Sequence, residues 1–264
     1  MRIANYCVIT VLLLLIGNSL ALAEEQNMLH PMKKAAGRLW YDTKYILTSP
    51  LRMDGKDVKK LVLFSGITYG LMNSVDTRVN SELTEPEYEE VEEIVDFLRA
   101  DVNNYKVHLA LGTLYLYGLT TADSKLKKTT LLLTEASLFN QLLTGGFKQI
   151  FGRVRPHKDR DEDTDIDADD FYPFSGNDSF PSGHTSSAFT LATVISNQYP
   201  STLVKVSSYT IASLVGFERL QTNVHNLSDV FAGAVLGIWV GNTICLLDKS
   251  WERGDIQVSA KGVK

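Results

Sequence analysis

The sequence predicts an all-α fold, a helical bundle with a six-helix core. Apolar residues recur mostly at three- and four-residue spacing, the pattern of one buried helix face. No stretch of any length alternates apolar and polar residues as a half-buried strand does. The chain has 264 residues, 44% of them apolar, enough for one domain with a substantial core. We therefore expect one helical domain.

The helical pattern falls into stretches separated by polar or turn-forming residues, and we expect about eight helices in all. The stretches are 59–75, 86–100, 105–120, 126–151, 183–198, 202–219 and 225–247. The last stretch is rich in small residues, at Ala232, Gly233, Ala234, Gly237 and Gly241. A stripe of small side chains predicts close packing of this helix against a neighbour.

Residues 1–23 are typical of a secretory signal peptide. Arg2 supplies the positive end, residues 8–16 the apolar stretch, and residues 21–23 a small-x-small cleavage site. The apolar stretch is shorter than the ~20 residues that span a bilayer, which favours cleavage over an uncleaved anchor. We expect the mature domain to cover residues 24–264.

Charge and cysteine content limit the compartment and the partners. The net charge is −5, and the chain has no basic arm for nucleic acid. Beyond the signal peptide, Cys245 is the one cysteine, so an exported domain has no internal disulfide. A glycan at the Asn226 sequon would lie beside His225, one of the candidate site residues below. We expect an exported protein in a bacterial periplasm, with membrane association left open.

The membrane question turns on residues 230–247, a run of 18 uncharged positions near the lower limit for a spanning helix. The other uncharged runs are shorter or rich in polar residues, and the mean hydropathy of the chain is −0.04. These observations favour a soluble or membrane-surface bundle over a polytopic protein.

A first cluster of candidate functional residues surrounds Lys148 and Arg155, which lie seven positions apart. Seven residues make about two turns of helix, so both cations are expected on one face before Pro156 ends the helix. Alone, this spacing is also common on solvated helix faces.

A second cluster is the string Pro181, Ser182, Gly183 and His184. Ser182 is a favourable N-cap, and Gly183 allows a ligand to approach the backbone, so the helix that follows presents free N–H groups to an anion. His184 would stand at the mouth of that site. Alone, the string also fits a capped helix with a surface histidine.

A third cluster contains Arg219, His225 and Asp229. The i, i+4 spacing predicts that Asp229 lies on the same helix face as His225 and accepts a hydrogen bond from one ring nitrogen. The other nitrogen is then free to act as a nucleophile. An ordinary surface His–Asp pair has the same spacing.

Together the clusters resemble the type-2 phosphatidic acid phosphatase family, which shares a superfamily with vanadium haloperoxidases and bacterial class A acid phosphatases. The family pattern is Lys-x6-Arg-Pro, then Pro-Ser-Gly-His, then Ser-Arg-x5-His-x3-Asp. The chain matches each position in order except the serine, where it has Glu218. The motif-bearing part, residues 148–229, is about a third of the chain. Residues 24–125 match only in being helical.

The resemblance implies a phosphoric monoester hydrolase that forms a phosphohistidine intermediate and uses no metal or cofactor. It implies that His225 attacks phosphorus with Asp229 behind it, and that His184 protonates the leaving oxygen. The implied phosphate-binding residues are Lys148, Arg155, Ser182, Gly183 and Arg219. The chemistry agrees, because fixed cations and helix N–H groups stabilise the charge on a transferring phosphoryl group.

Glu218 is the departure from the family pattern. A carboxylate ~4 Å from the phosphate would repel it by about 4 kcal/mol per unit charge at an effective dielectric near 20. Neighbouring helix positions point about 100° apart, so Arg219 can face the phosphate while Glu218 does not. We expect Glu218 to one side, bonded to a nearby cation or backbone N–H.

The sequence leaves the substrate open between a soluble phosphate ester and a lipid. One alternative is a membrane-embedded lipid phosphate or polyprenyl diphosphate phosphatase. Another is a haloperoxidase with vanadate bound at His225, which the modest chain length disfavours. A third is a non-catalytic phosphate-binding protein, which would tolerate loss of the histidines that are present here. The oligomeric state is also open.

Residues 159–170 are rich in Asp, which invites comparison with a calcium loop. An EF-hand beginning at Asp163 would need Gly at its sixth position and Glu at its twelfth, where the chain has Ala168 and Phe174. We expect a solvated acidic loop between the first and second clusters.

Overall fold

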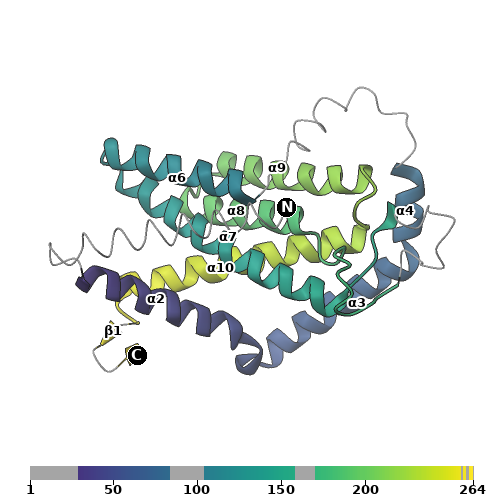
Figure 1. The fold of residues 1–264 in the computed structure, drawn as a ribbon, viewed down its shortest axis with the longest axis horizontal. Coiled ribbons are helices and arrows are strands. Elements are labelled where there is room, and N and C mark those ends of the chain that lie inside the picture. Colours follow the sequence, from purple (N-terminus) through teal and green to yellow (C-terminus); the bar gives the residue numbers. More distant parts are fainter. Residues whose placement is uncertain (1–28, 84–103, 158–169, 257, 260–261, 264) are drawn as a thin grey trace.

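A computed structural model describes residues 29–83, 104–157, 170–256, 258–259 and 262–263, and the fold is all-α (Figure 1). The described residues form eight α-helices, one short 3-10 helix and a two-stranded antiparallel hairpin near the C-terminus. The α-helices are α2 (Leu29–Leu47), α3 (Gly55–Ser74), α4 (Asp76–Leu83), α6 (Asn104–Thr120), α7 (Ser124–Phe151), α8 (Gly183–Gln198), α9 (Thr202–Gln221) and α10 (Leu227–Arg253). The smaller elements are η1 (Ser49–Arg52), β1 (Val258–Ser259) and β2 (Gly262–Val263).

The predicted fold class is confirmed, and six of the predicted helices correspond to α3, α6, α7, α8, α9 and α10. Capping sets several of the boundaries. The Asp54 side chain accepts from the N–H groups of Lys56 and Asp57, so α3 begins four residues before the predicted start. Helices α2 and α4 were not predicted. The predicted signal peptide and the predicted helix over 86–100 lie outside the described residues.

Helix α8 lies at the centre of the bundle and packs against α7, α9 and α10. Its closest neighbour is α10, through the predicted stripe of small residues. A Cβ added at Gly237 would lie 2.3 Å from the Ser186 carbonyl oxygen, and one at Gly233 would lie 2.5 Å from that of Ser182. The glycines therefore let the backbones of α8 and α10 approach directly, as the sequence predicted.

The apolar core fills the middle of the bundle, between α6, α7, α8 and α10. Its buried members are Ile46, Leu111, Leu132, Leu133, Ala136, Phe139, Val194, Val240, Ile244 and Cys245. Helix α2 docks on this core through polar contacts as well, because Arg38 donates to Asp248 at 3.0 Å and the Trp251 indole donates to Asp42 at 3.0 Å.

Within the described residues, α10 is the one helix long and apolar enough to cross a membrane. The mean hydropathy of its most apolar 18-residue window is 2.0, and half of that window is buried inside the bundle.

The three sequence clusters are carried by helix ends. Helices α7 and α9 end, and α8 and α10 begin, at the end of the bundle where α3 and α4 lie (Figure 1). Because α7 and α8 run antiparallel, as do α9 and α10, the connection within each pair returns the chain to the same end of the bundle.

Candidate active site

Lys148 and Arg155 converge, although not by the predicted route. Helix α7 ends at Phe151, and Gly152 follows it with a φ of 57°. A Cβ on Gly152 would lie 1.8 Å from the Tyr172 carbonyl oxygen, so a glycine is required here. Arg155 therefore lies in the loop after α7, and the prediction that both cations share one helix face is wrong.

The two cations meet instead at the carboxylate of Asp178. Arg155 donates from Nε to Oδ1 at 2.7 Å and from Nη2 to Oδ2 at 2.9 Å. The Lys148 ammonium lies 3.8 Å from Oδ2. One carboxylate oxygen therefore lies between the two predicted phosphate-binding cations, at a residue that the sequence analysis missed.

The second cluster begins α8 as predicted, with Ser182 at the N-cap. Ser182 is fully buried, and its hydroxyl pairs with that of Thr185 at 2.9 Å. The Ser182 side chain is therefore packed inside the first turn of α8. Gly183 lies beside Lys148, because a Cβ added there would be 3.7 Å from the lysine Nζ. His184 is half-buried in the first turn of α8. The first two clusters are therefore adjacent in space.

His225 precedes α10, which begins at Leu227, so the predicted helix start at His225 is wrong. Asp229 reaches back from the first turn of the helix and accepts from the Asn226 N–H at 2.9 Å, the geometry of a capping residue. Its Oδ2 lies 3.5 Å from His225 Nδ1. The predicted His–Asp pair is therefore adjacent, within ion-pair distance, while the predicted hydrogen bond to the His225 ring is not formed.

Buried partners fix Asp229 in place. Its Oδ2 accepts from the Ser179 hydroxyl at 2.6 Å, and its Oδ1 accepts from Arg153 Nη1 at 2.8 Å. Arg153 also donates to Ser228 at 2.6 Å and to Asp76 on α4 at 3.0 Å. The side chains of Arg153, Asp76 and Asp229 are at most 1% exposed. A buried ion network thus anchors the residue that faces His225.

The sequence analysis missed Arg153, Asp76 and Ser179. Arg153 stands two positions before Arg155 in the first cluster. Its positive charge within that cluster was the sequence signal that could have identified it. Asp76 gave no signal, because it lies more than seventy residues before the first cluster on a helix that the pattern did not predict. Only the packing of α4 against the start of α10 makes it a partner of Arg153.

Arg219 lies near the end of α9 and contacts both His225 and Glu218. Its backbone carbonyl accepts from the His225 N–H at 3.3 Å. Its Nε binds the Glu218 carboxylate, which is fully buried. Glu218 therefore bonds a nearby cation, as expected, and that cation is one of the predicted phosphate ligands.

His225 is fully buried, and this burial lowers the pKa of its imidazole to about 4. The nearby Asp229 opposes the shift, and the positive charges of Lys148 and Arg155 add to it. His225 is therefore neutral at pH 7 and its unprotonated nitrogen can act as a nucleophile.

The family model of the PAP2 superfamily, the type-2 phosphatidic acid phosphatases, matches residues 129–252, which contain all three clusters. This match assigns residues 129–252, just under half of the chain, to the PAP2 superfamily. A crystal structure of a transmembrane PAP2-type phosphatidylglycerolphosphate phosphatase from Bacillus subtilis aligns with a TM-score of 0.52 and 22% identity. That alignment covers 73% of this chain and 96% of the other, and it supports the same helical fold.

Two curated relatives are lipid A 1-phosphatases. The Porphyromonas gingivalis protein is 38% identical over 96 residues, which is 36% of this chain and 18% of the relative. The Rhizobium johnstonii protein is 32% identical over 105 residues, which is 39% of this chain and 41% of the relative. In both comparisons the matched stretch spans less than half of this chain and less than half of the relative.

Proposed function

We propose that this PAP2 protein is a membrane-associated phosphatase that removes phosphate from a lipid through a phosphohistidine intermediate at His225. The convergence of Lys148, Arg155, Arg219 and the start of α8 on one end of the bundle supports a phosphate site. The neutral, buried His225 supports its role as the nucleophile. The lipid A 1-phosphatases and the phosphatidylglycerolphosphate phosphatase described above support a lipid as the substrate.

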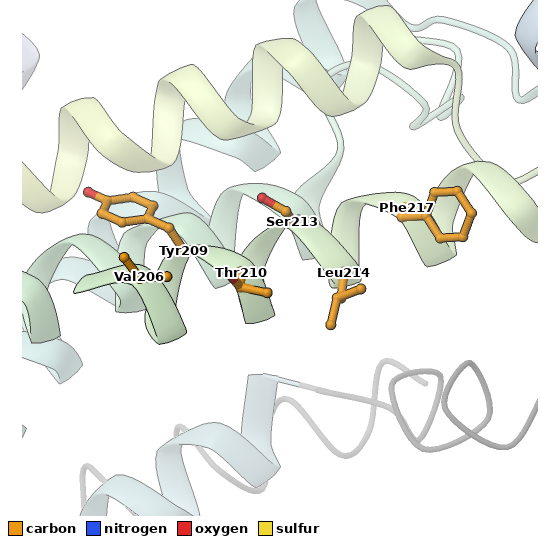
Figure 2. A pocket seen from close by; sticks show the side chains of 6 residues that line it. All are labelled: Val206, Tyr209, Thr210, Ser213, Leu214 and Phe217. Carbon is orange, nitrogen blue, oxygen red and sulfur yellow. The ribbon is translucent and has the colours of Figure 1, made fainter. Parts of the chain in front are cut away.

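The observation that favours a lipid over a soluble ester is the apolar outer surface of the bundle. Large apolar side chains on α9 face outward, including Leu203 at 77% exposed, Val206 at 58% and Ile211 at 57%. Figure 2 shows a shallow surface hollow lined from α9 alone, by Val206, Tyr209, Thr210, Ser213, Leu214 and Phe217. Phe217 lies near the end of α9, so this apolar surface runs toward the end of the bundle that carries the phosphate site, on a different face of the helix from Arg219.

Apolar side chains are also exposed on α3, α6 and α7, for example Val62 at 66%, Leu109 at 68% and Leu142 at 57%. Exposed apolar surface on several helices of one bundle is typical of contact with lipid. Because the site lies where α10 begins, a bilayer around the apolar surface would place the site near the headgroups. This geometry suits a phosphate carried by a lipid, and it favours the membrane alternative over a soluble bundle.

In the proposed reaction, the His225 nitrogen remote from Asp229 attacks phosphorus. The P–O bond to the lipid breaks, and His184 gives a proton to the leaving oxygen. Lys148, Arg155 and Arg219 stabilise the charge on the equatorial oxygens. Water then attacks the phosphohistidine while His184 acts as the base, which releases inorganic phosphate and restores both histidines.

The test is phosphate release by membrane and soluble fractions from phosphatidate in mixed micelles, a lipid carrying a sugar phosphate, and p-nitrophenyl phosphate. We expect activity in the membrane fraction, highest on a lipid, retained in EDTA and abolished by His225→Ala. The control variant His157→Ala, at an exposed position, should keep full activity. Equal activity of His225→Ala and the unchanged protein would refute the proposed nucleophile.

A further inference from the structure

The phosphate site of this protein contains its own anion. Asp178 lies in the loop before α8 and bridges Arg155, at 2.7 and 2.9 Å, and Lys148, at 3.8 Å. The Asp178 carboxylate thereby engages the Nε and Nη2 edge of the Arg155 guanidinium, the arrangement that binds phosphate well. The Asp178 carboxylate therefore lies where an anion in contact with both cations would lie.

The charges of the cations and carboxylates around the site balance, so the binding of a phosphate depends on whether a carboxylate leaves. In the ion pairs that the described residues form at this end of the bundle, the four cations Lys148, Arg153, Arg155 and Arg219 are paired with four carboxylates. These carboxylates are Asp76, Asp178, Glu218 and Asp229. A dianionic phosphate added to this balanced set would place uncompensated negative charge in a partly buried site, where screening is weak. Binding therefore favours departure of one carboxylate.

Exposure identifies which carboxylate can leave. Asp76, Glu218 and Asp229 are at most 1% exposed, so moving any of them would break buried contacts. The side chain of Asp178 is 46% exposed, against 17% for Lys148 and 25% for Arg155. Asp178 can exchange its cations for water by side-chain rotation. Its loop can stay fixed, since the adjacent Ser179 donates its N–H to the Arg153 carbonyl and its hydroxyl to Asp229.

The charge state of Asp178 suits this behaviour. Burial alone would raise its pKa, but the hydrogen bonds from Arg155 and the charges of Lys148 and Arg155 outweigh burial and lower it. The carboxylate is therefore ionised across the physiological range and competes with phosphate at every working pH.

We propose that the Asp178 carboxylate occupies the anion position between Lys148 and Arg155 in the empty site and is displaced by the substrate phosphate. Asp178 thereby sets the affinity of the site for phosphate. The proposal rests on the phosphate site of the proposed function and adds a residue that determines its affinity. An intramolecular competitor weakens the binding of inorganic phosphate as well as of substrate, so it also speeds release of the product.

The test compares Asp178→Asn with the unchanged protein at fixed ionic strength. We measure the inhibition constants of orthovanadate and inorganic phosphate, together with KM and kcat for p-nitrophenyl phosphate. We expect both inhibition constants and KM to fall at least tenfold, about 1.4 kcal/mol, without a rise in kcat. Asp178→Ser should act in the same direction, which covers the case in which one variant folds poorly.

Glu82→Gln is the matched control, because it removes one negative charge from exposed α4 at the same end of the bundle. It should change none of these constants by more than about twofold. Unchanged or weaker vanadate binding by Asp178→Asn would overturn the proposal, since a carboxylate that merely orients Arg155 predicts that outcome. If the unchanged protein hydrolyses the ester, the proposed function stands whatever Asp178→Asn does. If it neither hydrolyses the ester nor binds vanadate, both proposals fail.

Discussion

Replacing Arg153 by methionine tests the buried ion network that supports the nucleophile. Arg153 is fully buried between Asp76 and Asp229, at 3.0 and 2.8 Å, and also binds Ser228. Methionine fills a similar volume but leaves both carboxylates buried without a cation. Removal of one partner from a buried ion pair costs about 3–5 kcal/mol. For a chain of this size that corresponds to a fall of roughly 10 °C in Tm.

The assay is thermal unfolding of the purified protein in detergent, with Arg78→Met as the matched control. Arg78 is 78% exposed and pairs with Glu82, which is 61% exposed. Such a surface pair contributes less than about 1 kcal/mol, so the control should melt within about 3 °C of the unchanged protein. Adding Asp76→Asn to Arg153→Met should restore part of the loss, because it removes one uncompensated charge. A Tm for Arg153→Met within 3 °C of the unchanged protein would refute the reasoning.

Four further outcomes are expected. His184→Ala should slow alkyl phosphates far more than p-nitrophenyl phosphate, whose leaving group needs little protonation; equal losses would contradict its role as general acid. Burial lowers the pKa of His225 to about 4, from about 6.5 in the unfolded chain. Between these two pH values the unfolded state therefore binds a proton at His225 that the folded state does not. Stability should therefore be complete above pH 6.5 and fall by about 3 kcal/mol as the pH drops to 4, and His225→Gln should remove that part of the pH dependence in urea titrations. Gly237→Ala should destabilise by about 1–3 kcal/mol, since its Cβ would lie 2.3 Å from the Ser186 carbonyl oxygen, whereas Gly66→Ala, in open space on α3, should not destabilise. Arg219→Ala should lower kcat/KM at least about a hundredfold and Glu218→Ser less than about tenfold; the reverse order in steady-state kinetics would place Glu218 inside the phosphate site.

The sequence predicted most of the helices because their apolar periodicity and caps are local. The boundaries of α8 were predicted to the residue, and those of α6, α7 and α9 to within two residues. Helix α4 was missed because eight residues with mostly polar side chains carry too little periodicity. Helix α2 was missed although its sequence is amphipathic, and its place in the bundle is set by Arg38 and Asp42 meeting partners on α7 and α10.

The candidate site could be predicted as a set of residues but not as a geometry. The order and spacing of Lys148, Arg155, His184, Arg219 and His225 were sufficient to indicate the PAP2 superfamily. Helical spacing nevertheless misplaced two of them, since Arg155 follows the turn at Gly152 and His225 precedes α10.

The sequence alone determined the helical class, the superfamily and the motif residues, because periodicity and motif spacing are properties of the chain itself. Only the tertiary structure decided that Asp76 meets Arg153 and that Asp178 bridges Lys148 and Arg155. It also decided that Glu218 pairs with Arg219 inside the bundle. The physical reason is that burial and pairing of charges depend on which distant segments pack together. The same packing of α9 and the start of α10 buries His225 and keeps it neutral.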